Sequence, residues 1–411
     1  MTTDAPNRLL AWVMWTLGAL AYIAAALSRT SFGVAGKWAA ERFNVSPSAL
    51  GVFVIVQLMV YALMQVPAGL ILDWIGSRYT IAIGLAVIAI GQIGLALTTS
   101  YWLGIFVRIL IGGGDALIWS SVIRLIPSWF ESKYVPLMTQ FSSMTGQLGQ
   151  WLSAVPLVAV LSTHGWTPAF LAVAACSLLA LLLDLLFVRD TPEGGIYSPG
   201  SKIAGIGGVK EVISRPGVRL GFYVHFTTNL SQIAFALMWG YSYLQEAQGF
   251  SLSQASLMFA LMVLANMIFS PLIGILTARF PAHRVELALG SIVYVVASWT
   301  AVLLLPTPAP LWLMVNLIVA MAVCTPMSNI GFELNRYYAP KGRMGTGSGV
   351  VVVGGFLSAL TLIGLIAIVL AILGHSPKAW QIAMACQYPL WIIGTLGIFV
   401  ARKKTLKQLT Q

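Results

Sequence analysis

The stretch Arg108-Ile-Leu-Ile-Gly-Gly-Gly-Asp115-Ala-Leu-Ile-Trp-Ser-Ser-Val-Ile-Arg124 places three charges in an otherwise apolar segment. On a helix that rises about 1.5 Å per residue, the two arginines lie roughly 24 Å apart, close to the thickness of the hydrocarbon core of a bilayer. Each arginine can extend its side chain to an interface. Asp115 is too short to do so, and a charge at bilayer depth costs about 3 kcal/mol. The stretch therefore predicts a membrane-spanning helix with a functional carboxylate; the alternative is a structural ion pair with a neighbouring arginine.

The composition of the whole chain is that of a membrane protein. Of its 411 residues, 58% are hydrophobic and 9% are charged, which leaves too few polar groups to cover a soluble globule. Apolar runs of about 20 residues between short polar loops are typical of an all-α bundle rather than of an outer-membrane barrel. We expect twelve transmembrane helices, at residues 9–36, 48–72, 79–98, 102–127, 137–161, 167–188, 218–244, 252–278, 285–305, 311–335, 345–373 and 379–401.

The basic residues fall mainly on one side of these expected spans. The net charge is +11, and the loops of the other side hold only Lys37, Arg42 and Lys378. By the positive-inside rule, we expect a multi-pass protein of the cell membrane with both termini in the cytoplasm. All three cysteines lie in apolar runs, so we expect neither a disulfide nor a metal site.

One connection between the spans is long. Residues 189–217 include the turn-forming stretches 191–195 and 198–200, so we expect a six-helix bundle at 1–188, a cytoplasmic linker at 189–217 and a second six-helix bundle at 218–411. A degenerate repeat supports this division, since Gly69–Arg78 recurs in part as Gly274–Phe280, half a chain further on. Paired bundles favour a transporter that rocks around a site at the middle of the membrane.

The loop between the second and third expected spans carries a recognisable motif. Gly69-Leu-Ile-Leu-Asp73-Trp-Ile-Gly76-Ser-Arg78 resembles the G-x-x-x-D-x-x-G-x-R/K signature of the major facilitator superfamily. The resemblance implies that Asp73 faces the start of the eleventh helix, near residues 345–348, and Arg124, and thereby controls a cytoplasmic gate. A carboxylate is favoured at a positive helix terminus and beside a guanidinium. An ordinary solvated turn is the alternative.

The fourth span resembles one particular branch of this superfamily. Residues 108–116 are similar to the R-x-L-x-G-x-x-E-A segment of the anion:cation symporter branch, with Asp115 in place of the usual glutamate. This implies a small organic anion, such as a sugar acid, as substrate, with protons or sodium as the coupling ion and Asp115 as the proton carrier. The position of Asp115 indicates the same role independently, because a buried carboxyl group can bind a proton in one conformation and release it in another.

The first span supplies a cation. Leu27-Ser-Arg29-Thr-Ser-Phe-Gly-Val-Ala35 resembles the first helix of the same branch and of the organophosphate:phosphate antiporters, in which an arginine binds the anionic group of the substrate. We expect Arg29 to bind substrate, with Tyr22 on the same face, because a guanidinium offers two parallel donors to a carboxylate. The alternative is an arginine that reaches an interface or pairs structurally with Asp115.

This chain departs from these families at two points. Ser28 replaces an acid that is common in the anion symporters, which argues against a two-proton scheme. The seventh span has no arginine like that of the antiporters, which disfavours divalent phosphates.

Several polar residues in other spans are candidates for the cavity wall. His225, Asn229 and Gln232 share one face of the seventh span, and His225 is a second candidate for proton coupling. Gln147 in the fifth span and Asn329 in the tenth complete the expected substrate-binding set. Hydrogen bonds between helices are the alternative for these residues. The Thr325-Pro326 dipeptide predicts a bend in the tenth span.

Two acids near the expected cytoplasmic ends of their spans, Asp184 and Glu333, are not part of this set. We expect each of them to anchor a gate or a loop rather than to bind substrate.

Together these features predict a secondary transporter of the major facilitator fold that moves a small organic anion by alternating access with proton coupling. The central site is expected between the first, fourth, fifth, seventh and tenth spans. We expect no enzyme, no cofactor and no nucleic-acid partner, because catalytic and phosphate-binding motifs are missing from the sequence. We also expect a monomer in the lipid bilayer. The alternatives are a proton-driven exporter of drugs or metabolites on the same fold, and a membrane receptor or scaffold that does not transport.

Overall fold

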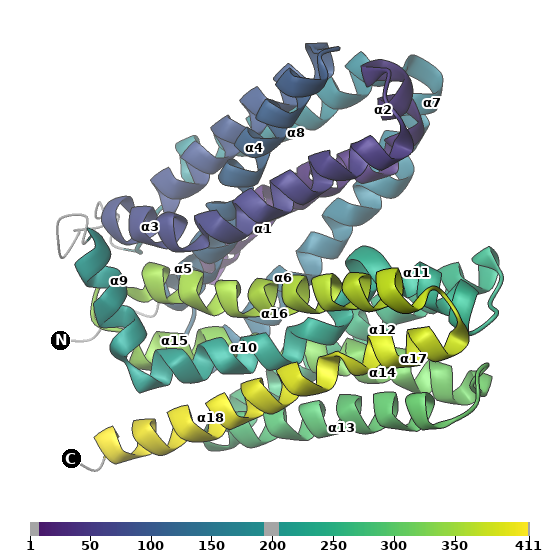
Figure 1. Ribbon diagram of the computed structural model, residues 1–411. Helices are drawn as coiled ribbons and strands as arrows, with labels where there is room; N and C mark the ends of the chain where they lie inside the picture. Colours follow the sequence, from purple (N-terminus) through teal and green to yellow (C-terminus); the bar gives the residue numbers. More distant parts are fainter. Residues whose placement is uncertain (1–7, 193–204, 410–411) are drawn as a thin grey trace. The chain divides into compact units, whose positions relative to one another are not determined.

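The computed structural model describes residues 8–192 and 205–409, which form helices and no strand (Figure 1). The prediction of an all-α protein is therefore confirmed for this part of the chain. Of the turn-rich stretches expected at 191–195 and 198–200, residues 193–195 and 198–200 lie outside the described residues.

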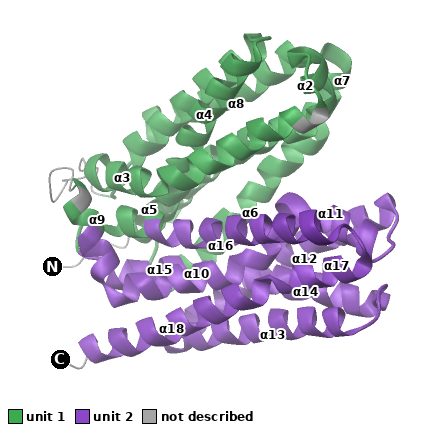
Figure 2. Ribbon diagram, in the orientation of Figure 1, with its two compact units in different colours: residues 1–209, 341–349 green, residues 210–340, 350–411 purple. Residues whose placement is uncertain are grey.

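The chain divides into two compact units (Figure 2). Unit 1 comprises Met1–Val209 together with Lys341–Gly349, and unit 2 comprises Lys210–Pro340 together with Val350–Gln411. The start of the helix α16 thus belongs to unit 1, whereas the rest of this helix belongs to unit 2.

The helices up to the linker are α1 (Arg8–Val34), α2 (Gly36–Phe43), α3 (Pro47–Leu97), α4 (Tyr101–Ala116), α5 (Ile118–Trp129), α6 (Val135–Leu152), the π-helical turn η1 (Ser153–Leu157), α7 (Val158–His164) and α8 (Trp166–Phe187). Next come α9 (Gly205–Ser214), α10 (Pro216–Ala234), η2 (Phe235–Trp239), α11 (Gly240–Ser242), η3 (Tyr243–Ala247), α12 (Leu252–Arg279), η4 (Pro281–His283), α13 (Arg284–Leu304), α14 (Leu311–Met327), α15 (Ile330–Tyr338), α16 (Met344–Leu373), α17 (Pro377–Ala385) and α18 (Gln387–Leu409). The short helices α2 and α9 are elements that the sequence analysis did not predict.

Nine helical segments of the described chain are long and apolar enough to cross a membrane. They are Arg8–Val34, Ala49–Leu97, Tyr101–Trp129, Trp166–Phe187, Leu252–Arg279, Pro281–Leu304, Leu311–Tyr338, Met344–Leu373 and Pro377–Gln408. The segment Ala49–Leu97 alone covers two expected spans. The expected spans at 137–161 and 218–244 fall instead on helices that π-helical turns interrupt.

The helix α3 changes direction at Gly76. This residue has φ 84° and ψ 175°, a conformation outside the helical region, and only glycine adopts it without a steric penalty. The conformation ends the second expected span and begins the third within one continuous run of residues.

Two other long segments are broken at residues that weaken a helix. The break at Leu117, between α4 and α5, follows Gly112, Gly113 and Gly114, which have low helix propensity. The break at residues 328–329, between α14 and α15, follows Pro326, whose ring removes a backbone hydrogen bond. This interruption lies close to the Thr325-Pro326 dipeptide, where the sequence predicts a bend.

An aromatic cluster closes one end of unit 1. The ring of Phe53 stacks on Phe32 with centroids 4.7 Å apart and lies 5.1 Å from Phe43, and Trp166 meets Phe43 edge to face at 5.7 Å. All four rings are buried. Because Phe43 ends α2, its burial holds this short helix against α3 and α8.

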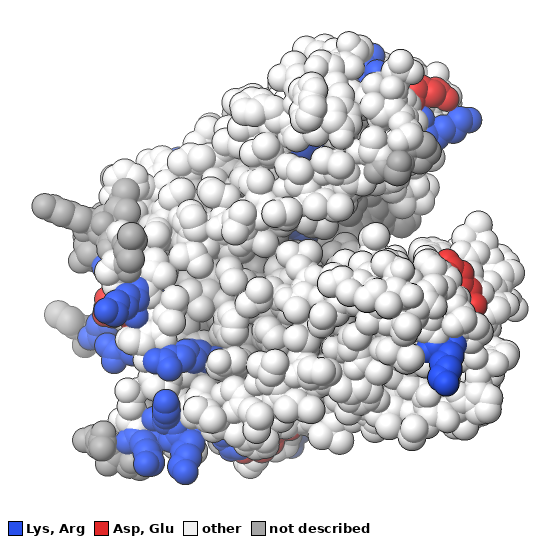
Figure 3. Space-filling view, in the orientation of Figure 1, with Lys and Arg blue, Asp and Glu red and all other residues white. Residues whose placement is uncertain are grey.

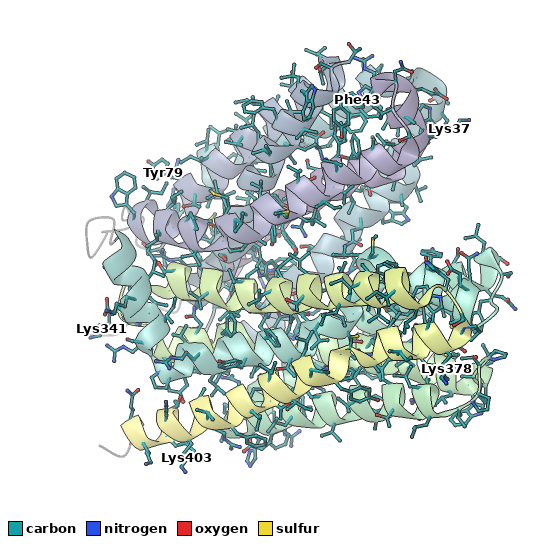
Figure 4. All side chains as sticks on the ribbon, in the orientation of Figure 1. Lys37, Phe43, Tyr79, Lys341, Lys378 and Lys403 are labelled. Carbon is teal, nitrogen blue, oxygen red and sulfur yellow. The ribbon has the colours of Figure 1, made fainter. Side chains whose placement is uncertain are left out.

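Charged side chains gather at the ends of the helices, and the visible flanks between the ends are almost free of them (Figure 3). In unit 1, Tyr79 and Lys341 mark one end and Lys37 marks the other; in unit 2, Lys403 and Lys378 lie at opposite ends (Figure 4). The structure places Lys37 in α2 and Lys378 in α17 rather than in the loops expected for them.

The consecutive glycines of α4 offer a matched test of this packing. A Cβ atom on Gly112 would lie 2.6 Å from the backbone oxygen of Gln57 in α3, whereas one on Gly113 would meet nothing within 4 Å. We expect Gly112→Ala to lower the free energy of unfolding by about 1–3 kcal/mol. Gly113→Ala should be neutral or stabilising by up to about 1 kcal/mol, since alanine favours a helix. Thermal unfolding of the two purified variants measures the difference, and equal stabilities would contradict the packing.

Candidate functional site

The centre of unit 1 holds a buried ion pair between α1 and α4. The Arg29 guanidinium donates from Nε to Oδ2 of Asp115 at 2.7 Å and from Nη2 to Oδ1 at 2.8 Å. The Asp115 side chain is fully buried, whereas that of Arg29 is 21% exposed. The geometry is the two-point contact that a guanidinium makes with a carboxylate. One edge of the Arg29 guanidinium is thus hydrogen-bonded to Asp115, and part of the Arg29 side chain remains accessible to solvent.

Two tyrosines frame this ion pair. The Tyr61 ring of α3 faces the Arg29 guanidinium, with 4.9 Å between Cζ and the ring centroid, a distance suited to a cation–π contact. Tyr22 of α1 interacts with Arg29 as well, and its ring packs on Trp119 with centroids 4.8 Å apart. The aromatic rings therefore restrict the positions that the guanidinium can adopt.

Tyr61 is a residue that the sequence analysis missed. It lies four residues after Gln57 and four before Gln65, and all three side chains are buried on one face of α3. Polar residues at this spacing in an apolar span were the available signal.

Arg108, the first arginine of the fourth span, does not extend to an interface, contrary to our expectation. Arg108 is 1% exposed, and its Cζ lies 4.9 Å from the Phe32 ring centroid. Its Nε and Nη1 atoms have no hydrogen-bond partner among the described residues. The Arg108 side chain is long enough to reach an interface, but the surrounding helices enclose it inside unit 1. Asp115 forms its ion pair with Arg29, and Arg108 acts on it only through its charge.

The residues of the gate motif meet their expected partners within unit 1. Asp73 accepts hydrogen bonds from the backbone N–H of Gly345 at 2.6 Å and of Thr346 at 2.8 Å, and from the Thr346 hydroxyl at 2.6 Å. Arg124 lies 3.6 Å from the same carboxylate and donates to the backbone oxygen of Leu72 at 2.6 Å. The first N–H groups of α16 are free to bind the carboxylate because they have no partner within the helix.

Two features of the loop position this carboxylate. A Cβ atom on Gly69 would collide with the backbone of Gly345, so glycine allows the close approach of the two helices. Asp190, which follows α8, accepts hydrogen bonds from the N–H groups of Ser77 at 2.6 Å and Arg78 at 3.3 Å. The sequence analysis did not select Asp190, because its position after a predicted span gave no indication of a loop 112 residues earlier.

The polar residues of the seventh span form a network inside unit 2. The ring of His225 contacts the Ser328 backbone oxygen through Nδ1 at 3.1 Å and the Asn229 side-chain amide through Nε2 at 3.0 Å. Gln232 accepts a hydrogen bond from Thr325. Asn329 is buried beside Ser328. These contacts join α10 to the break between α14 and α15.

Gln147 belongs to unit 1 and is half-buried on α6. It follows Gly146, which packs against the Tyr22 ring. The structure therefore places Arg29, Tyr22, Asp115 and Gln147 in one unit, and His225, Asn229, Gln232 and Asn329 in the other.

A bundle of long apolar helices with a buried ion pair and a glycine-dependent gate motif defines a membrane transporter. Residues 18–363 match the sequence profile of the Major Facilitator Superfamily, and the chain belongs to this family. It is accordingly a multi-pass membrane transporter and not an enzyme.

Relatives by sequence are named as transporters of organic anions. The probable sulfoacetate transporter SauU of Cupriavidus necator is 23% identical over 291 residues, which cover 67% of this chain and 67% of that protein. The galacturonate transporter of Dickeya chrysanthemi is 25% identical over 185 residues, covering 45% of this chain and 53% of the relative. The hexuronate transporter of Bacillus subtilis is 21% identical, with 56% of each chain covered. The chain thus spans about half the length of the last two, and the resemblance to the anion:cation symporter branch is confirmed.

Solved structures share the fold. The Major Facilitator Superfamily transporter FucP, in the outward conformation, superposes with a TM-score of 0.72 at 14% identity, covering 94% of this chain and 99% of that one. The proton:xylose symporter XylE superposes with a TM-score of 0.69 at 16% identity, covering 97% and 96%.

The Thr346 hydroxyl gives a test of the gate contact. We expect Thr346→Val to remove one donor from the Asp73 carboxylate and to weaken the contact by about 1.5–3 kcal/mol. Faster hydrogen exchange at the first residues of α16 would report the loss. Thr346→Ser retains the hydroxyl and should exchange like the parent; if the two variants exchange alike, the hydroxyl does not support Asp73.

Proposed function

We propose that the protein carries a small organic anion together with a proton across the cell membrane by alternating access. The observation that supports this proposal is the ion pair of Arg29 and Asp115, which is buried on the aspartate side and partly open on the arginine side. A substrate carboxylate and Asp115 compete for the same guanidinium donors. Protonation of Asp115 releases Arg29, and the substrate then takes its place.

The charges of this exchange balance. The empty site pairs one guanidinium with one carboxylate. The loaded site pairs the guanidinium with the substrate carboxylate, while Asp115 is neutral. Because the net charge of the site is the same in both forms, neither form leaves Arg29 or Asp115 as an unpaired charge at bilayer depth, which would be costly. One proton therefore accompanies one anionic group, in line with the single acid beside Arg29 and with Ser28 in the position before it.

We also propose the twelve-span topology, with bundles at 1–188 and 218–411 joined by a cytoplasmic linker at 189–217 and with both termini in the cytoplasm. In this topology Ala49–Leu97 forms two spans on either side of Gly76. The stretches 135–164 and 216–247, each helical apart from π-helical turns, form one span apiece. Each is about 45 Å long, which exceeds the hydrocarbon core.

The names of the relatives guide the choice of substrate. Sulfoacetate, galacturonate, hexuronate and tartrate transporters are among them, and we propose an acid of this class. The side chains of Gln147, His225, Asn229, Gln232 and Asn329 would bind the neutral hydroxyl groups of such an acid. Thermal stabilisation of the purified monomer by a panel of these acids would identify the substrate.

Substitution of Asp115 tests proton coupling. In the parent, substrate affinity should rise as the pH falls, by up to about tenfold per pH unit if one proton is bound. In Asp115→Asn, Arg29 is always available, so binding should be independent of pH and the variant should exchange substrate without accumulating it uphill. Uptake into proteoliposomes under a proton gradient measures this, with sodium replaced by potassium as a control. Uphill accumulation equal to the parent's would exclude Asp115 as the proton carrier.

Substitution of Arg29 tests the substrate contact. Lysine keeps the charge but lacks the two parallel donors, so we expect Arg29→Lys to weaken anion binding by roughly 10- to 100-fold. Arg279→Lys, at the exposed end of α12, is the matched control and should bind as the parent does. If Arg29→Lys binds the anion normally, the two-point contact is not the substrate site.

A further inference from the structure

Asp184 is a buried acid that the proposed transport cycle does not use. It lies on α8, one turn before the end of the helix, and is 2% exposed. Neither of its carboxylate oxygens has a hydrogen-bond partner among the described residues. An ionised carboxylate without donors in such a place is strongly unfavourable. This arrangement of the side chains therefore suits the neutral acid.

The charged groups around Asp184 are few. Its helix packs on α3, α1 and α7, and the charged groups that act on it are Arg78 of α3 and Asp190 beyond the end of α8. The Asp190 carboxylate accepts hydrogen bonds from the backbone N–H groups of Ser77 and Arg78. It adds a negative charge nearby, which further disfavours a second carboxylate.

Arg78 is close to Asp184 but is bonded elsewhere. Its Nη2 atom donates to the backbone oxygen of Leu185 at 2.5 Å, and its Nε atom is buried without a hydrogen-bond partner in the described structure. The Arg78 guanidinium thus donates to the neutral carbonyl of Leu185, and its Nε–H group makes no hydrogen bond among the described residues.

We propose that Asp184 is a proton-binding site distinct from Asp115, and that loss of its proton moves Arg78 from the Leu185 carbonyl to the Asp184 carboxylate. The proton passes to water at this end of unit 1, and a charge-assisted pair replaces a hydrogen bond to a neutral carbonyl. No other bond changes. The site binds a proton and no larger ligand.

The site is connected to the gate motif through the backbone. Arg78 follows Gly76 by two residues, and Gly76 follows Asp73 by three. The change of partner at Arg78 therefore takes place in the segment that carries the gate motif, and it does not involve the ion pair between Arg29 and Asp115.

Thermal unfolding as a function of pH tests the proposal without a transport assay. In the folded protein Asp184 is neutral, whereas in the unfolded chain it meets water and ionises, so raising the pH from about 6 to about 9 should favour unfolding. Asp184→Asn should remove this part of the pH dependence. The matched control is Glu131→Gln, because the hydrogen bond from Lys133 lowers the pKa of Glu131, and this exposed acid stays ionised over the same range.

Arg78 supplies the second arm of the experiment. In Arg78→Gln the ionised Asp184 has no cation to pair with, so the loss of stability with rising pH should become steeper. The double variant with Asp184→Asn should be as flat as the single Asp184→Asn variant. In infrared spectra of the parent, a protonated carboxyl band should be present at neutral pH and missing from Asp184→Asn, and this reading remains informative if a variant unfolds.

The outcomes separate clearly. Coincident pH profiles of the parent and Asp184→Asn, or an unchanged carboxyl band, would overturn the proton site. A slope that Arg78→Gln leaves unaltered would overturn the movement of Arg78. Because none of these readings involves substrate, a failure of the proposed transport function would not produce them.

Discussion

The structure depends on one constraint, which is the free-energy cost of burying a charge inside an apolar helical bundle. Arg29 and Asp115 are tolerated there because each neutralises the other through two hydrogen bonds, and separating them without compensation would leave a buried charge unpaired. Any cycle that uses Arg29 to hold another anion must therefore neutralise Asp115 at the same time. In the proposed cycle, coupling between anion and proton follows from this constraint alone.

The surrounding helices preserve the geometry of that pair. Gly112 and Gly114 let α4 approach both halves of α3, and Gly149 lets α6 approach the backbone of α1. These contacts fix the two helices that carry the ion pair. Tyr61 then covers one face of the guanidinium. Arg108 is buried on the same helix as Asp115, with its Cζ atom 4.9 Å from the centroid of the Phe32 ring.

Much of this arrangement could be predicted from the sequence, because charges are rare in it. Arg29, Asp115, Asp73 and Arg124 stand out from apolar surroundings, and motif spacing indicated the partners of Asp73. Residues whose role depends on a neighbour distant in the chain could not be found this way. In the sequence, Tyr61 cannot be told apart from the other aromatic residues of the spans, and Asp190 resembles any polar residue that follows a span. The burial of Arg108 depends on neighbouring helices that cannot be inferred from its own segment. The short helices α2 and α9 were not predicted because neither has an apolar run of spanning length.

The contact between Asp73 and the start of α16 affects how the protein folds during its synthesis. Its two partners are separated by 272 residues in the chain. At a synthesis rate of about 5–20 residues per second, Asp73 waits roughly 14–54 seconds for the backbone groups that bind it. During that time water must solvate the carboxylate, which requires the part of α3 next to Gly76 to stay at the membrane surface. The helices α1 to α8 can therefore insert early, but unit 1 becomes complete only after residues 341–349 have been synthesised.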